Sequence, residues 1–180
     1  MKQIILNHFP NCSNLNCSCN IQRDSFETII LKQVRIYDED TNDKATPSKI
    51  VDIKDEGLVE VENQLIEDFT FLKIDECLVI SKENRKCDCA IYNSKEFYFI
   101  ELKDTKTKGR AKAKKDAVIQ LEETIKLFSN INFGQRIKKC VIGLRTKNPF
   151  IIQSSSNTKR AIFNDTYGFE LLEGSKIELI

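Results

Sequence analysis

The apolar run at residues 97–100, followed directly by Glu101-Leu102-Lys103, constrains the fold of this chain more than any other segment. Successive side chains of a β-strand point to opposite faces of the sheet. Odd-numbered residues of the run would therefore lie on one face and even-numbered residues on the other. Because both faces are apolar until Glu101, the segment is predicted to be a central strand covered on both sides.

The end of this predicted strand carries two charges that are costly to bury without partners. Glu101 and Lys103 are two residues apart, so they would share one face. Asp88 lies on the preceding predicted strand, within the reach of a hairpin. Alternation on that strand places Asp88 on one face, and Cys87 and Cys89 together on the other.

The segments before this pair of strands have ambiguous patterns. Residues 24–37 favour a helix that opens with a capping box, and a strand at 29–31 is the alternative. Residues 50–72 are either a hairpin that turns at 55–57 or a helix. The helix is favoured, at least through the sequence NQLIEDF.

The later segments have clearer patterns. Short β-type runs predict an antiparallel meander, and apolar residues at helical spacing then predict a long amphipathic helix. A buried-type strand follows, and the C-terminal part has further strands. The meander strands are 76–81, 87–92 and 96–102, the helix is 111–130, the next strand is 138–145, and the C-terminal strands fall within 149–155 and 167–174.

The order helix, three-stranded meander, helix, strand predicts an α/β fold in which helices flank a central mixed sheet. A chain of 180 residues has the length of a single domain. Within it we expect an irregular, Cys-rich N-terminal segment at 1–23, a core at about 55–146 and a C-terminal extension at 147–180.

The charge of the chain is balanced overall but not locally. The 28 basic and 27 acidic residues give a net charge of +1, so the whole molecule is not a general polyanion binder. Residues 103–115, however, hold seven Lys or Arg and one Asp. This run is either a solvated helix start or a surface for nucleic-acid phosphates. The residues expected to contact nucleic acid are Lys106, Lys108, Arg110 and Lys112.

The residues at the end of the strand suit phosphodiester hydrolysis. A hard cation such as Mg²⁺ or Mn²⁺ takes oxygen ligands, and Asp88, Glu101 and the Leu102 carbonyl would supply three. Such a cation would lower the pKa of a bound water. Lys103 would orient that water or offset charge on the phosphate. Gln120, on the following helix, would hold a water or a phosphate oxygen.

Asp88 followed by Glu101-Leu102-Lys103 resembles the PD-(D/E)xK, or restriction-endonuclease-like, nuclease superfamily. The resemblance covers about residues 55 to 146 and implies that Asp88 and Glu101 are metal ligands and that Lys103 is catalytic. Gln120 resembles a glutamine that some branches carry on this helix. The chain departs from the pattern where Cys87 replaces proline before Asp88.

The superfamily often has a further acid on its first helix. Glu60 and Glu67 are both candidates for that position, and the sequence does not choose between them.

The seven cysteines predict reduced thiols or metal ligands rather than disulfides, as in a cytoplasmic protein. No apolar stretch predicts a secretory signal or a membrane span. A tetrahedral Zn²⁺ site could form from residues of the N-terminal segment, although their spacing is irregular and free thiols are the alternative. These candidate zinc ligands are His8, Cys12, Cys17 and Cys19. An iron–sulfur cluster is disfavoured because no cysteine follows Cys140.

Other enzyme classes are disfavoured by composition. One histidine disfavours a His-based triad, and six scattered glycines form no phosphate-cradling loop. The resemblance implies a metal-dependent endonuclease that acts on DNA, or alternatively on RNA. Its small size favours a homodimer or a subunit of a larger complex, and a role in antiviral defence follows by analogy alone. The rival hypotheses are a non-catalytic nucleic-acid- or protein-binding module on the same fold and a small zinc-stabilised interaction protein.

Overall fold

The computed structural model describes residues 1–9, 24–38, 47–65, 67–79, 85–104, 109–144, 153–154 and 157–180. It is an α/β structure with two mixed sheets and a few flanking helices, as the sequence predicts at this level. The helices are α1 (Lys2–His8), α3 (Arg110–Leu127) and α4 (Asn157–Ile162), which continues into a π-helix, η1 (Phe163–Tyr167). No helix among the described residues is long and apolar enough to span a membrane.

The larger sheet has seven strands in the order β1-β5-β6-β7-β8-β10-β9. The pairs β1–β5, β5–β6, β6–β7 and β10–β9 are antiparallel, whereas β7–β8 and β8–β10 are parallel. Helix α3 crosses from β7 to β8, as a parallel connection requires. The strands are β1 (Phe26–Ile29), β5 (Phe69–Lys73), β6 (Cys89–Tyr92), β7 (Glu96–Lys103), β8 (Ile137–Leu144), β9 (Gln153–Ser154) and β10 (Glu170–Gly174).

The smaller sheet has four strands in the order β11-β4-β2-β3. Strand β11 is parallel to β4, and the other two pairs are antiparallel. Its strands are β2 (Gln33–Tyr37), β3 (Lys49–Val51), β4 (Val59–Asn63) and β11 (Lys176–Leu179). The last strands of the chain, β10 and β11, thus join different sheets.

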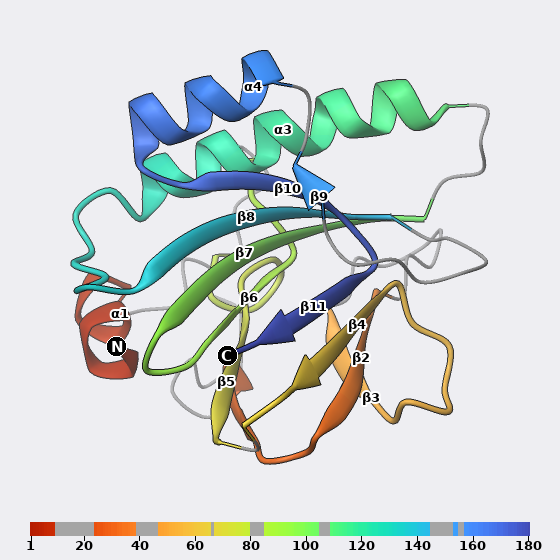
Figure 1. Ribbon diagram of the computed structural model, residues 1–180. Coiled ribbons are helices and arrows are strands. Elements are labelled where there is room, and N and C mark those ends of the chain that lie inside the picture. The colour runs from red at the N-terminus through yellow and green to blue at the C-terminus, as the bar shows by residue number, and fades with distance from the viewer. Residues whose placement is uncertain are drawn as a thin grey trace.

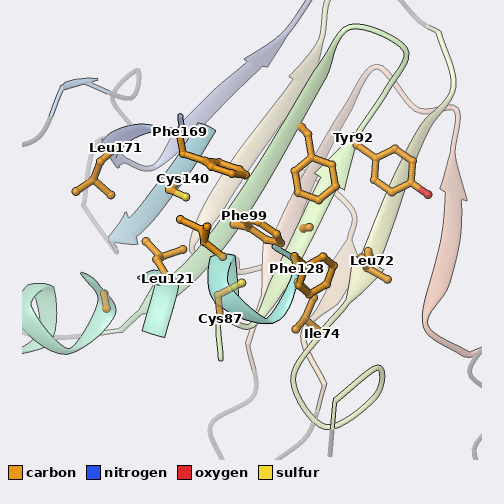
Figure 2. Close-up of a cluster of buried hydrophobic side chains, with 14 of the residues drawn as sticks. Leu72, Ile74, Cys87, Tyr92, Phe99, Leu121, Phe128, Cys140, Phe169 and Leu171 are labelled. Atoms are coloured by element: carbon orange, nitrogen blue, oxygen red, sulfur yellow. The ribbon is translucent and has the colours of Figure 1, made fainter. Parts of the chain in front are cut away.

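The larger sheet is covered on both faces, as predicted for β7 (Figure 1). Helices α3 and α4 lie over one face and the smaller sheet lies over the other. Phe97 and Phe99 pack in the cluster beneath α3, together with Phe128 (Figure 2). Tyr98 and Ile100 pack in the cluster between the two sheets. The alternation along β7 is therefore confirmed.

The prediction that Cys87 and Cys89 share a face is wrong. Cys87 packs under α3 (Figure 2), whereas Cys89 lies between the sheets. The reason is that β6 begins at Cys89, so the alternation of a strand does not extend back to Cys87.

The favoured helix at 24–37 is also wrong, because this segment contains β1 and β2. Ile30, on the expected apolar face of the helix, is 62% exposed, whereas Val34 and Ile36 are buried at the two-residue period of a strand. The β-branched residues of this segment suit a pleated surface once β4 and β5 supply partners.

Residues 47–65 and 67–73 hold strands and turns, so the expected first helix is wrong. Val59, Val61 and Asn63 are buried at period two, whereas Leu65 of the expected helical face is 51% exposed. The alternative hairpin is not formed either, because β2 lies between β3 and β4 in the sheet.

The meander itself is confirmed, but with a different first strand. The first strand is β5 (Phe69–Lys73), and the described part of the expected strand at 76–81 is a turn. Helix α3 and strands β6, β7, β8 and β10 lie where the sequence predicts them. The segment expected to be irregular at 1–23 begins with helix α1.

Candidate active site

Strand pairing brings the predicted site residues together at the end of β7. In the antiparallel β6–β7 pair, Cys89 lies opposite Ile100, so Asp88 comes next to Glu101. The Asp88 carboxylate accepts a hydrogen bond from the Leu102 backbone N–H at 2.5 Å. Glu101 and Lys103 share the face that α3 covers, and α3 supplies Gln120 to the same place. The structure therefore assembles all four of the predicted site residues.

Glu101 is a carboxylate in the interior of the protein. Its side chain is 0% exposed, and its Oε1 forms an ion pair with Lys103 Nζ. Its Oε2 has no hydrogen-bond partner among the described residues. Burial and the neighbouring charge of Asp88 raise the pKa of Glu101 well above its usual range, and the Lys103 ammonium opposes this rise. The site thus disfavours the simultaneous ionisation of Asp88 and Glu101 unless a cation lies beside them.

Lys103 and Gln120 are connected by hydrogen bonds. Lys103 Nζ donates to Gln120 Oε1 at 3.0 Å, and Gln120 Nε2 donates to the Lys86 carbonyl at 3.2 Å. Thr124, one helical turn after Gln120, donates to the Gln120 carbonyl and accepts the Cys87 N–H at 2.7 Å. These contacts fasten α3 to residues 86 and 87, directly before Asp88.

Asp88 is held through its backbone as well as its side chain. Its carbonyl accepts hydrogen bonds from the N–H groups of Ile74 and Asp75, both at 3.1 Å. Burial raises the pKa of Asp88 to about 7, and the negative charge of Asp38 adds to the rise, while the Leu102 N–H and Lys103 oppose it. Ionised Asp88 is therefore costly in the absence of a cation.

The structure adds residues that the sequence analysis missed. Asp75 follows β5 and pairs with the buried Lys86 at 3.0 Å. Asp38 follows β2 and lies close enough to raise the pKa of Asp88. Asp75 ends an apolar run just as Glu101 does, and that signal could have identified it if β5 had been assigned as a strand. No local signal points to Asp38, which reaches the site through the packing of the second sheet.

The two candidates for an additional acid lie elsewhere. Glu60 faces outward from the smaller sheet, where it pairs with Arg35 and Lys176, both at 3.8 Å. Glu67 is exposed between β4 and β5. The structure therefore brings neither residue to Asp88 and Glu101. The expected helix that would have carried one of them is absent from this described part of the chain.

The candidate zinc ligands are only partly within the described residues. His8 Nε2 lies 3.0 Å from the Leu127 carbonyl, and its ring packs against Phe9. Cys12, Cys17 and Cys19 lie outside the described residues. The described cysteines are buried thiols that form no disulfide with one another, and these are Cys77, Cys87, Cys89 and Cys140.

The predicted basic surface begins where α3 begins. Arg110 and Lys112 lie in its first turn, which has no acidic residue and no side-chain cap. The positive end of a helix dipole repels such side chains and attracts anions. The positive charge there is therefore unfavourable for the helix and favourable for a phosphate. Lys106 and Lys108 lie outside the described residues.

The described residues offer a cation two carboxylates, but not a complete set of protein ligands. No three or more His, Cys, Asp and Glu side chains among them form a group that could hold a metal ion. The pair Asp88 and Glu101, however, has a fully buried oxygen without a partner. Mg²⁺ is commonly held by one or two carboxylates, with water and substrate phosphate as its other ligands. The two carboxylates therefore suit this kind of ion.

No family model matches this chain, and no curated protein or solved structure is similar enough to count as a match.

Proposed function

We propose that this protein is a metal-dependent nuclease of the PD-(D/E)xK type that hydrolyses phosphodiester bonds, with DNA as the preferred substrate. The observation that carries the proposal is the meeting of Asp88, Glu101 and Lys103 at one strand end, with Glu101 Oε2 buried and unpartnered. The antiparallel meander, the crossing helix and the parallel strand β8 support it, because the superfamily core has this order after its first helix.

The residues of the site have separate roles in this reaction. Asp88, Glu101 and the Leu102 carbonyl would hold Mg²⁺ or Mn²⁺, which when bound supplies charge to polarise the phosphate and lowers the pKa of water. Lys103 lies beside these carboxylates and offsets negative charge that develops on the phosphate. Gln120 fixes the position of the Lys103 ammonium through its side-chain oxygen.

The path of the nucleic acid follows from the position of α3. The chain leaves β7 at Lys103 and enters α3 at Arg110, so the basic helix start lies at the same end of the larger sheet as the site (Figure 1). Phosphates next to the scissile bond would contact Arg110 and Lys112. The outer face of the smaller sheet is a poor alternative surface, because Glu60, Glu62 and Glu178 gather there around Lys176.

The setting of this activity is also part of the proposal. We infer that the protein acts in the cytoplasm, as a homodimer or as a subunit of a larger complex, because cutting both strands of a duplex requires two sites. Cleavage of RNA instead of DNA is the alternative, and the experiment described next includes both substrates.

The test is cleavage of circular DNA, linear DNA and RNA with Mg²⁺, with Mn²⁺ or with EDTA. We expect cutting that needs the cation and that falls by about a hundredfold or more in Asp88→Asn and Lys103→Met. Glu67→Gln is the matched control, because it removes an exposed carboxylate outside the site and should cut like the wild type. Cutting of the circular substrate identifies an endonuclease.

The remaining outcomes contradict the proposal. Cleavage that survives in both site variants places the activity elsewhere or in a contaminant. Absence of cleavage by every form, together with salt-sensitive DNA binding, favours the non-catalytic binding module.

A further inference from the structure

Among the described residues, Lys103 is the positive neighbour of the buried Glu101, and it also contacts Gln120. Glu101 is 0% exposed and lies next to Asp88, so its charge needs compensation inside the protein. Among the described residues, the ion pair with Lys103 provides it. The Lys103 side chain is 21% exposed, whereas that of Glu101 is 0% exposed.

The second contact of Lys103 has a fixed orientation. An ammonium has three donors, and Lys103 directs another one to Gln120 Oε1 at 3.0 Å. The other end of the Gln120 amide donates to the Lys86 carbonyl at 3.2 Å, which sets the oxygen toward Lys103. Thr124, one turn later on α3, accepts the Cys87 N–H at 2.7 Å, so the Gln120 amide projects from a part of α3 that is bonded to the neighbouring chain. Gln120 is thus a preset acceptor for the Lys103 ammonium.

We propose that Lys103 occupies the place of a cation on Glu101 in the metal-free protein, and that Gln120 retains its ammonium when a divalent cation displaces it from the carboxylate. This inference rests on the proposed metal-dependent function. It makes the ion pair and cation binding mutually exclusive, so the pair lowers the affinity for the metal. It also makes Gln120 a positioning residue, which keeps the displaced ammonium beside the site where the substrate binds.

The experiment measures Mn²⁺ binding directly, without substrate, by calorimetry or by electron paramagnetic resonance. Lys103→Met removes the competing ammonium, so Mn²⁺ should bind about tenfold more tightly than to the wild type. Gln120→Met removes the acceptor of the displaced ammonium, so Mn²⁺ should bind several-fold more weakly. In the Lys103→Met background, Gln120→Met should change the affinity by less than about twofold, because no ammonium remains to be held.

The control separates displacement from a simple loss of positive charge. Lys115→Met removes one exposed charge from the same helix and should leave the Mn²⁺ affinity within about twofold of the wild type. Lys103→Gln is the second variant, to be used if Lys103→Met does not fold, and it should also tighten binding. Unchanged or weaker binding by the Lys103 variants overturns the inference, as does an equal effect of Gln120→Met in both backgrounds.

Different results would refute the displacement of Lys103 and the metal-dependent nuclease function. A wild-type protein that binds Mn²⁺ and cuts DNA, with no tightening in Lys103→Met, refutes the displacement and leaves the nuclease proposal intact. Absence of Mn²⁺ binding in the wild type and in Lys103→Met refutes the metal-dependent function, and the displacement with it.

Discussion

At the residue scale, the site consists of side chains that are costly to keep charged and backbone groups that hold them in place. Asp88 is fixed through its carbonyl by the N–H groups of Ile74 and Asp75 and through its carboxylate by the Leu102 N–H. Its carboxylate cannot turn away without losing the bond from the Leu102 N–H. Burial and the negative charge of Asp38 therefore disfavour the ionised form of Asp88.

This opposition predicts a pH-dependent stability in the absence of metal. The pKa of Asp88 rises from 3.8 to about 7 on folding, so its favourable contribution is complete below about pH 4 and is lost as pH rises to about 7. Unfolding in urea with EDTA should show a falling free energy across this window. The fall in the free energy of unfolding has an upper bound of roughly 4 kcal/mol. The observed fall should be smaller, because Asp88 is partly exposed to water.

Asp88→Asn supplies the control for this prediction. Its free energy of unfolding should fall less steeply between about pH 4 and 7, because the substituted side chain does not titrate. Identical slopes for the variant and the wild type would show that Asp88 titrates normally in the folded protein.

At the element scale, the first turn of α3 carries charges that disfavour the helix itself. Helices favour acidic residues in their first turn, whereas α3 begins with Arg110 and Lys112 after Gly109 and has no acid there. The hydrogen bonds of Gln120 and Thr124 and the apolar face under the helix hold it in place instead. A charge arrangement that the helix itself disfavours is consistent with a surface for phosphates.

Replacing these charges should weaken DNA binding and stabilise the helix. Arg110→Gln and Lys112→Gln should each lower the steepness of the dependence of log affinity on log salt by about 1. Each should also raise the free energy of unfolding by about 0.3–1 kcal/mol, because a repulsion with the helix dipole is removed. Fluorescence anisotropy at several salt concentrations and urea unfolding provide the two measurements.

Lys126→Gln, in the last turn of the same helix, is the matched control. Lys126 pairs with Glu123 at 2.7 Å and lies at the favourable end of the dipole. Its substitution should leave the salt dependence unchanged and slightly lower the stability. An equal effect on DNA binding from both ends of α3 would argue against a localised phosphate surface.

The turn after β5 carries strain that can be measured. Glu76 has φ of 56°, a left-handed conformation that costs a non-glycine residue energy, and it directly follows Asp75. Glu76→Gly should keep the free energy of unfolding unchanged or raise it by up to about 1 kcal/mol, whereas Glu76→Val should lower it by about 1–2 kcal/mol. Urea unfolding checks both.

Glu67→Gly tests whether the conformation is responsible. Glu67 does not have positive φ, so glycine there brings no relief and should lower the stability by about 0.5–1 kcal/mol. Equal losses from glycine at both positions would contradict the predicted strain at Glu76.

At the scale of the whole molecule, the smaller sheet packs closely over the larger one beside the site. A Cβ at Gly143 of β8 would lie 2.5 Å from Val59 Cγ2 of β4 and 3.0 Å from Leu102 Cδ2 of β7. Leu102 is the residue whose N–H bonds Asp88. Contact between the sheets therefore depends on the absence of a side chain at Gly143.

Gly143→Ala should thus lower the free energy of unfolding by about 1–3 kcal/mol through overpacking. Val59→Ala makes room for the added methyl group, so the double variant should lose less than the sum of the two single variants. Urea unfolding of all four proteins measures this difference. Additive losses would mean that Val59 is not the group that Gly143→Ala displaces.

The elements that the sequence predicted correctly are those whose interacting residues lie close together along the chain. The sequence by itself predicted β7 with its terminal Glu101 and Lys103, the neighbouring Asp88, helix α3 and strand β8. These elements have strong local periods and follow one another directly, so short connections bring them together. Gln120 was predicted from its place on the following helix and from the resemblance to a superfamily glutamine.

Tertiary structure alone decided the first third of the fold and the surroundings of Asp88. Residues 24–37 and 50–72 have apolar spacings that suit a helix or a strand, and the partners that make them strands lie far along the chain, as β11 does for β4. Asp38 and Asp75 reach Asp88 from separate strands. Local periodicity determines an element when its pattern is unambiguous, whereas hydrogen bonding and burial between distant segments determine the rest.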